Sequence, residues 1–208
     1  MAVYSALIVV GDGSEEIEFS ASLDILARAG FHVKTASVMS SVGRTDHRRL
    51  LCTLSRGMKV EADHTVSEII ESHAKNFDVI VVPGGMPGAK HCADSSDLIS
   101  MLKEQKARGG WYAAICASPA VVFRGKNIVS NEKMVCYDYK DFNEALIAGN
   151  NMGKGRVCVS GKCITSVGPS SAIDFALAIV ECIVGKHKAD ELAKDLMMID
   201  DRVSPVIC

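Results

Sequence analysis

The chain has 208 residues, of which 48% are hydrophobic and 23% are charged, with 5 prolines and 17 glycines. This composition is typical of a globular protein and excludes a disordered or fibrous one, and the length predicts a single domain over residues 1–208. The formal net charge is −2, so the chain lacks the positive field that grips a polyanion, and we expect no nucleic-acid partner.

The chain alternates apolar runs rich in β-branched residues with amphipathic segments. In chain order the first half predicts a strand at 3–10, a helix at 14–29 capped by Asp12 or Ser14, a strand at 31–39, a loop at 40–49, a hairpin of 50–54 and 58–62, and a strand at 77–82. The second half predicts a helix at 95–108, a strand at 111–115, a helix starting at 117–119, strands at 157–160 and 163–167, and helices at 168–184 and 189–197. Such an order predicts an α/β fold with an open, mainly parallel, flavodoxin-like sheet between helices.

Two apolar segments are candidates for targeting or membrane insertion. Residues 1–10 are apolar, but no basic residue precedes them and no cleavage site follows, so we interpret them as a strand rather than a signal peptide. Residues 173–184 contain Asp174 and Glu181 and are too few to cross a bilayer. The sequence therefore predicts no membrane partner.

The eight cysteines fit neither a disulfide scaffold nor a zinc site. They are too sparse for a disulfide framework, none forms a C-x-x-C pair, and no histidine accompanies the closest two, Cys158 and Cys163. We expect free thiols, no metal, no cofactor and a reducing, cytoplasmic setting. Cys52, near the hairpin, and Cys208 are the thiols that we expect to be exposed.

Unusual residues follow three of the predicted strands. Residues 14–18 follow the first strand and include three glutamates, Gly84 and Gly85 follow the strand at 77–82, and Cys116 follows the strand at 111–115. Ligands of open parallel sheets bind at the carboxyl ends of the strands, and these ends share one edge. We therefore expect the three segments to form one site.

Cys116 is the candidate nucleophile of this site. A sulfur near the start of a helix is favoured as thiolate, so we expect its pKa to lie below the usual value of about 8.5. The N–H groups of Gly85 and Ala117 are the candidate oxyanion donors. A carboxyl group from Glu15, Glu16 or Glu18 is the candidate acid or base. The plainer alternatives are a small cysteine of the core and glutamates that serve only the helix dipole.

Four ordered motifs stand out along the chain: GSEEIE at 13–18, VPGG at 82–85, AAICASP at 113–119, and SVGP at 166–169 followed by IDFAL at 173–177. Together they resemble the ThiJ/PfpI superfamily, in the DJ branch of the Parkinson disease protein seven. The resemblance implies a fold of the class I glutamine amidotransferase type and a homodimer.

The resemblance also implies roles for single residues. Cys116 matches the reactive cysteine, and Glu18 matches the carboxyl group that contacts it in protonated form. Gly85 and Ala117 match the backbone donors. The substrate-binding set that it implies is Arg28 and Arg56 at the mouth of the pocket near the dimer interface, Gly84, and Tyr137, which stands where some members have a histidine.

The function that the resemblance implies is glutathione-independent glyoxalase or protein deglycase activity on methylglyoxal and glyoxal. Cys116 forms a hemithioacetal and Glu18 moves the proton, with weak turnover expected. The alternative is a non-catalytic oxidative-stress sensor or redox-dependent chaperone that works through the sulfinic acid of Cys116. A peptidase is not expected, because Ala117 stands where peptidase-like members have a histidine.

Overall fold

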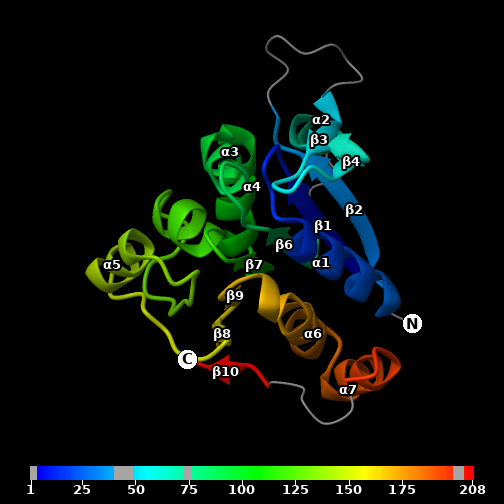
Figure 1. The fold of residues 1–208 in the computed structure, drawn as a ribbon, viewed down its shortest axis with the longest axis vertical. Coiled ribbons are helices and arrows are strands. Elements are labelled where there is room, and N and C mark those ends of the chain that lie inside the picture. The colour runs from blue at the N-terminus through cyan, green and yellow to red at the C-terminus, as the bar shows by residue number, and fades with distance from the viewer. Residues whose placement is uncertain (1–3, 40–48, 73–75, 199–203) are drawn as a thin grey trace.

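The computed structural model describes residues 4–39, 49–72, 76–198 and 204–208, and most of its strands form one sheet. These strands are β1 (Ser5–Val10), β2 (His32–Ser37), β5 (His64–Thr65), β6 (Val79–Val82), β7 (Trp111–Ile115), β8 (Val157–Ser160), β9 (Cys163–Ser166) and β10 (Val206–Ile207). Their order across the described sheet is β10-β8-β9-β7-β6-β1-β2-β5 (Figure 1). All neighbours pair in parallel except β8 and β9, which are antiparallel.

The order of the parallel strands confirms the predicted fold class. Counted among themselves in chain order, β1, β2, β6, β7 and β9 lie in the order 2-1-3-4-5, which is the flavodoxin-like order. The predicted hairpin is also present, as antiparallel β3 (Leu51–Thr53) and β4 (Lys59–Glu61). Cys52 on β3 points into the core and is buried, so its expected exposure is wrong. The loop predicted at 40–49 lies outside the described residues except for its last position.

Helices cover both faces of the sheet. They are α1 (Glu16–Arg28), α2 (Val66–Glu71), α3 (Gly88–Asp94), α4 (Ser96–Ala107), a π-helix (Pro119–Arg124), α5 (Lys140–Ala148), a 3-10 turn (Pro169–Ser171), α6 (Ala172–Ile183) and α7 (Lys186–Asp195). Successive residues of β1 point to opposite faces, so Ile8 packs in the core with α1 and α6, while Leu7 and Val9 pack in the core with α4 and the π-helix. Both faces are therefore buried, as the continuous apolar strands indicate.

The sequence analysis does not anticipate α3, α5 and β10. Helix α3 has only seven residues, and both α3 and α5 begin without a side-chain cap, so the start signal that marks α4 is missing from both. The helix expected after Cys116 is a π-helix, in which the Gly125 N–H donates to the carbonyl of Ala120, five residues back. These elements take their form from tertiary packing rather than from local sequence pattern.

The first helix is capped by Glu15, so the cap predicted at Asp12 or Ser14 is wrong. Glu15 Oε2 accepts a hydrogen bond from the Glu18 N–H at 2.8 Å. Asp12 instead accepts from the Thr53 N–H at 2.9 Å, and Ser14 accepts from Gly11. The chain is still turning at these two residues, and α1 begins only at Glu16.

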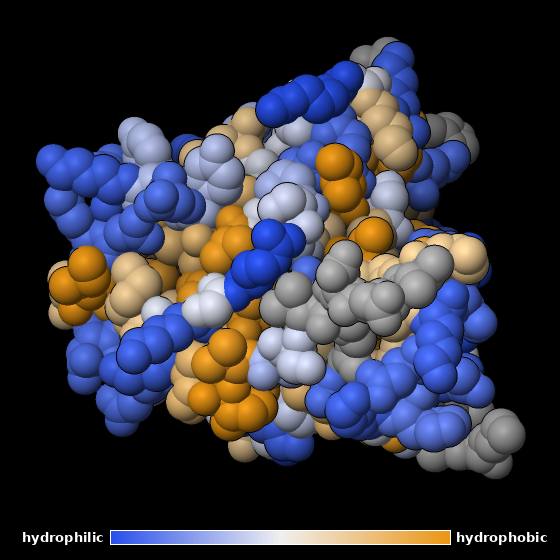
Figure 2. Space-filling view, turned by 60° about the horizontal axis from the view of Figure 1, so that its bottom comes forward, coloured by the Kyte–Doolittle hydropathy of each residue, from blue (hydrophilic) through white to orange (hydrophobic). Residues whose placement is uncertain are grey.

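No helix within the described ranges is long and apolar enough to cross a membrane. Figure 2 shows one face of the molecule, on which orange apolar patches are separated by blue polar side chains.

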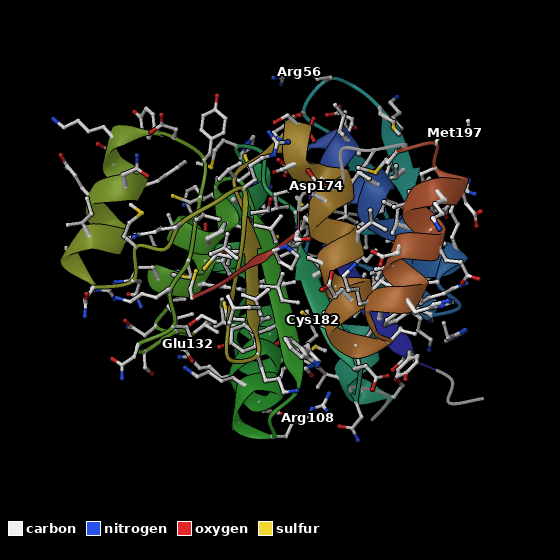
Figure 3. The ribbon with its side chains drawn as sticks, turned by 90° about the horizontal axis from the view of Figure 1, so that it is seen from below. Arg56, Arg108, Glu132, Asp174, Cys182 and Met197 are labelled. Atoms are coloured by element: carbon white, nitrogen blue, oxygen red, sulfur yellow. The ribbon has the colours of Figure 1, made fainter. Side chains whose placement is uncertain are left out.

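Glu132 lies at the edge of the molecule opposite Arg56, toward the same side as Arg108 (Figure 3). It binds Lys106 Nζ at 2.6 Å and accepts a hydrogen bond from the Tyr112 hydroxyl at 3.0 Å. Burial alone would raise the pKa of Glu132, but hydrogen bonds, above all from Lys106, lower it to about 2. The carboxylate thus joins α4, β7 and the segment before α5.

A Glu132→Gln variant is expected to lose about 2 kcal/mol of stability at pH 7, because the folded state binds the ionised carboxyl group more strongly than the unfolded state does. The lowered pKa makes this contribution present above about pH 4.5 and lost as the pH falls toward 2. Urea unfolding should therefore show that the difference in stability between wild type and Glu132→Gln is smaller at low pH than at pH 7. Glu144→Gln is the control, because its pair with Lys140 is exposed, and it should change stability by less than about 0.5 kcal/mol. A constant gap would contradict the assignment.

Candidate active site

Cys116 occupies a tight turn directly after β7. Its backbone is left-handed, with φ of +65°, a conformation that residues other than glycine rarely adopt. Its N–H donates to the Ser166 carbonyl at 2.9 Å, and its carbonyl accepts from the Tyr137 N–H at 2.8 Å. The flanking strand and loop therefore hold this strained conformation, which fixes the direction of the sulfur.

Glu18 lies in the first turn of α1 and is fully buried. Its Oε2 accepts a hydrogen bond from the Gly84 N–H at 2.7 Å. Its Oε1 is also buried and has no hydrogen bond of good geometry, although the carboxyl group is close enough to Cys116 for each to shift the pKa of the other. One carboxylate oxygen thus remains available beside the sulfur.

The two other glutamates of this segment have structural roles. Glu15 caps α1, and Glu16 accepts hydrogen bonds from the Ser55 hydroxyl at 2.7 Å and from the Arg56 N–H. These contacts tie the start of α1 to the turn between β3 and β4. Of the three carboxyl groups in the segment, Glu18 is the one that faces the sulfur of Cys116.

The segments after β6 and β7 each supply one backbone donor to the site. The N–H groups of Gly85 and Ala117 donate toward the Cys116 sulfur. Gly84 must lack a side chain, because a Cβ there would lie 2.6 Å from Cys116 Cβ and 3.0 Å from Glu18 Oε2. Gly84 therefore lets the main chain approach the side chains of Cys116 and Glu18 closely.

Burial has the largest effect on the pKa values of the pair. Burial, followed by the charge of Glu18, raises the pKa of Cys116 to about 12, although Gly85 and Ala117 act to lower it. Burial also raises the pKa of Glu18 to about 7, and the hydrogen bond from Gly84 only partly offsets this. The expected lowering of the Cys116 pKa is therefore wrong: the next helix begins only at Pro119, and two N–H groups do not outweigh burial beside a carboxylate.

Tyr137 is joined to the site through its backbone. Its N–H binds the Cys116 carbonyl, and its ring packs over Gly168, where an added Cβ would lie 3.3 Å from the ring. The side chain is 49% exposed. The structure thus places Tyr137 beside the turn that carries the sulfur, with its ring exposed to solvent.

The two arginines lie in different places. Arg56 is exposed on the connection between β3 and β4, at the outer edge of the molecule (Figure 3) and next to the start of α1. Arg28 is in the last turn of α1, paired with Asp24 at 2.7 Å. It lies ten residues beyond Glu18, or about 15 Å along a helix that rises 1.5 Å per residue. Arg28 is therefore distant from Glu18 within this chain, and its place near a dimer interface stays a prediction.

The sequence analysis missed Ser118. Its buried hydroxyl donates to the Pro83 carbonyl at 2.7 Å and so fastens the loop after β6 to the turn after β7. The one available signal is a polar residue two positions after the candidate nucleophile, in an otherwise apolar segment.

Comparison with known proteins places this chain in a family. A sequence profile of the DJ-1/PfpI family matches residues 4–182. The chain belongs to the DJ-1/PfpI family. This confirms the resemblance seen in the four sequence motifs.

Members of the family with known names or structures are similar over most of this chain. Glutathione-independent glyoxalase DJR-1.2 of Caenorhabditis elegans is 33% identical, over 93% of this chain and 96% of its own length. Protein DJ-1 homolog B of Arabidopsis thaliana is 36% identical over 90% of this chain, which spans only 40% of that relative. The structure of oxidized Toxoplasma gondii DJ-1 is 43% identical, with a TM-score of 0.84, and the match covers 94% of this chain and 98% of that one.

Proposed function

We propose that this protein is a glutathione-independent glyoxalase that converts methylglyoxal and glyoxal to 2-hydroxy acids. The observation that carries the proposal is the buried pair of Cys116 and Glu18 under the N–H groups of Gly85 and Ala117. The relative named as a glyoxalase in Caenorhabditis elegans supports it. Removal of dicarbonyl adducts from proteins would use the same groups.

The pair supplies a thiolate without carrying two charges. Its two pKa values of about 7 and about 12 mean that it loses a single proton near neutral pH. The remaining proton can reside on the sulfur or on Glu18, and both forms carry the same net charge. The N–H groups of Gly85 and Ala117 stabilise the form with a thiolate and a protonated Glu18. This form is the nucleophile.

The reaction begins when the Cys116 thiolate adds to the aldehyde carbon. The C–S bond forms, the carbonyl π electrons move to oxygen, and that oxygen takes the proton of Glu18 to give a hemithioacetal. The N–H groups of Gly85 and Ala117 stabilise the oxyanion as it develops.

Glu18, now a carboxylate, then acts as the base. It removes the proton from the former aldehyde carbon and returns a proton to the neighbouring carbon, which turns the hemithioacetal into a thioester of the 2-hydroxy acid. Water cleaves the thioester and releases the acid and the thiol. The sum is one dicarbonyl and one water converted to one hydroxy acid, with no external oxidant or reductant.

Assembly and location complete the proposal. A homodimer and a cytoplasmic setting follow from the family resemblance and from the free thiols of the eight cysteines. The side chains that we propose to contact the substrate are Arg56, at the outer edge, and the exposed ring of Tyr137.

A second candidate is a sensor or redox-dependent chaperone that works through the sulfinic acid of Cys116. The free Oε1 of Glu18 favours it, because a protonated carboxyl group there can donate a hydrogen bond to an oxygen atom on the sulfur. A sensor of this kind needs no turnover.

The deciding experiment measures lactate formed from methylglyoxal without glutathione. Cys116→Ser is expected to lower kcat/KM by about 10³-fold while the protein stays folded. Cys182→Ser is the matched control, because Cys182 is a half-buried thiol on α6 outside the site. If the wild type makes no more lactate than Cys116→Ser, the enzyme proposal fails, and rapid oxidation of Cys116 by peroxide would then favour the sensor.

A further inference from the structure

Strand β10 brings a second pair of thiols together outside the Cys116 site. We propose that peroxide converts Cys158 and Cys208 into a reversible disulfide that fastens β10 to β8. The inference concerns residues that the proposed glyoxalase does not use.

The register of the two strands puts both cysteines on one face. Val206 pairs with Cys158 in the parallel ladder, and the Cys208 N–H donates to the Val159 carbonyl at 2.8 Å. Paired residues of parallel strands point to the same side, and so do residues two apart in one strand. Cys158, Val206 and Cys208 therefore share a face of the sheet, at the edge where Figure 1 shows β10 beside β8.

Neighbouring glycines confirm this orientation. A Cβ added at Gly153 would lie 2.8 Å from the Cys158 sulfur, and one added at Gly155 would lie 2.7 Å from Val206 Cγ2. Both side chains thus lie under the same stretch of chain before β8. Burial, followed by the nearby Cys208, raises the pKa of Cys158, as expected for two thiols on the same face.

The two thiols differ in access, which assigns their roles. Cys208 is exposed, whereas Cys158 is fully buried and also hydrogen-bonds to the Lys133 carbonyl at 3.3 Å. A peroxide from solution reaches Cys208 first. Cys158 is then the resolving thiol, shielded from solvent but next to the oxidised sulfur.

The chemistry balances with one molecule of hydrogen peroxide. The Cys208 thiolate attacks a peroxide oxygen, the O–O bond breaks, and hydroxide leaves with a proton as water to give a sulfenic acid. The Cys158 sulfur attacks that sulfenic sulfur, the S–O bond breaks, and the departing hydroxide takes the Cys158 proton as a second water. Two thiols are oxidised, and the peroxide is reduced.

The bond would protect the edge of the sheet. Among the described residues β10 has only two paired positions, Val206 and Ile207, so it is held weakly and Cys208 has room for the small shift that bond formation needs. Detachment of β10 would expose the unpaired edge of β8, a template for pairing with another chain. A covalent link keeps that edge covered while the cell is oxidising.

The test treats the full-length protein with one equivalent of hydrogen peroxide and maps its peptides without reduction. We expect a Cys158–Cys208 cross-link in wild type, in Cys116→Ser and in Cys182→Ser, reversed by dithiothreitol and absent from Cys208→Ser. The Cys208 position is exposed, so its replacement should leave the fold intact. In oxidised wild type, hydrogen exchange at the Cys208 amide should slow by about tenfold.

Three results would overturn the proposal. The first is Cys208 recovered as a sulfinic acid while Cys158 can still be alkylated after unfolding. The second is Cys208 cross-linked to a second chain. The third is an intramolecular cross-link that leaves hydrogen exchange at the Cys208 amide unchanged.

Discussion

Glu18→Gln is expected to make the protein more stable at pH 8 by about 2 kcal/mol, because it removes a buried carboxylate. The folded protein raises the pKa of Glu18 from 4.5 to about 7. Between these values the unfolded chain releases a proton that the folded chain retains, so stability falls as the pH rises through this window and stays lower above it. The amide oxygen of glutamine can still accept the hydrogen bond from Gly84.

Urea unfolding at pH 5 and pH 8 checks this expectation. The gain from Glu18→Gln should be larger at pH 8. Glu16→Gln is the control on the same helix, because hydrogen bonds from Ser55 and Arg56 lower the pKa of Glu16 even though burial opposes them, and its replacement should not stabilise the fold. An equal gain from Glu18→Gln at both pH values would show that the carboxyl group is not destabilised in the folded state.

The same substitution should lower turnover of methylglyoxal by about 10² to 10⁴-fold, the usual contribution of a positioned acid or base. Wild-type activity should fall as the pH drops below about 7, where the pair holds both protons. The variant should lose this limb of the pH profile. A more stable but less active protein would mean that the buried acid is kept for reactivity at the expense of the fold.

Gly85→Ala is expected to destabilise the protein by about 3 kcal/mol or more, since left-handed strain and overpacking add together. Gly85 has φ of +84°, and a Cβ there would meet the Gly13 carbonyl and lie 2.7 Å from the Glu15 nitrogen. Both contacts are with backbone, which cannot move aside as a flexible side chain can. The shift would also withdraw the Gly85 N–H from the Cys116 sulfur.

Gly109→Ala separates strain from crowding. Gly109 has φ of +75°, but nothing lies within 4 Å of an added Cβ. It should cost about 1 kcal/mol, the strain alone. Thermal unfolding should show a large loss of stability for Gly85→Ala and a small one for Gly109→Ala. The rate of Cys116 alkylation should change in Gly85→Ala and stay normal in Gly109→Ala. Equal losses of stability would mean that the close approach of the loop to Gly13 is not rigid.

The sequence predicts the parallel strands, and the edge at which their carboxyl ends meet, because burial leaves a strong pattern. Strands such as β6 and β7 are continuously apolar, and four positions of α4 that recur at helical spacing are all buried: Leu98, Met101, Leu102 and Gln105. Gln105 tolerates burial because its amide donates to the Phe77 and Trp111 carbonyls. Periodicity identifies the buried face, and only the structure shows how a polar residue there is satisfied.

Local pattern could not give the electrostatics of the site. The dipole argument for Cys116 considers one helix, whereas the pKa is set by burial and by Glu18, which the fold brings from almost one hundred residues earlier in the chain. Contacts across the fold and loss of water decide this pKa, and neither is visible in the local sequence pattern.

Main-chain hydrogen bonds hold the Cys116 turn in place, through Ser166 on one side and Tyr137 on the other. The identity of those two side chains contributes little to these bonds. Side chains around this turn can therefore be substituted without displacing the sulfur. Such a scaffold is well suited to acquire new substrates, and Tyr137 and Arg56 are natural positions at which to diversify it in directed evolution.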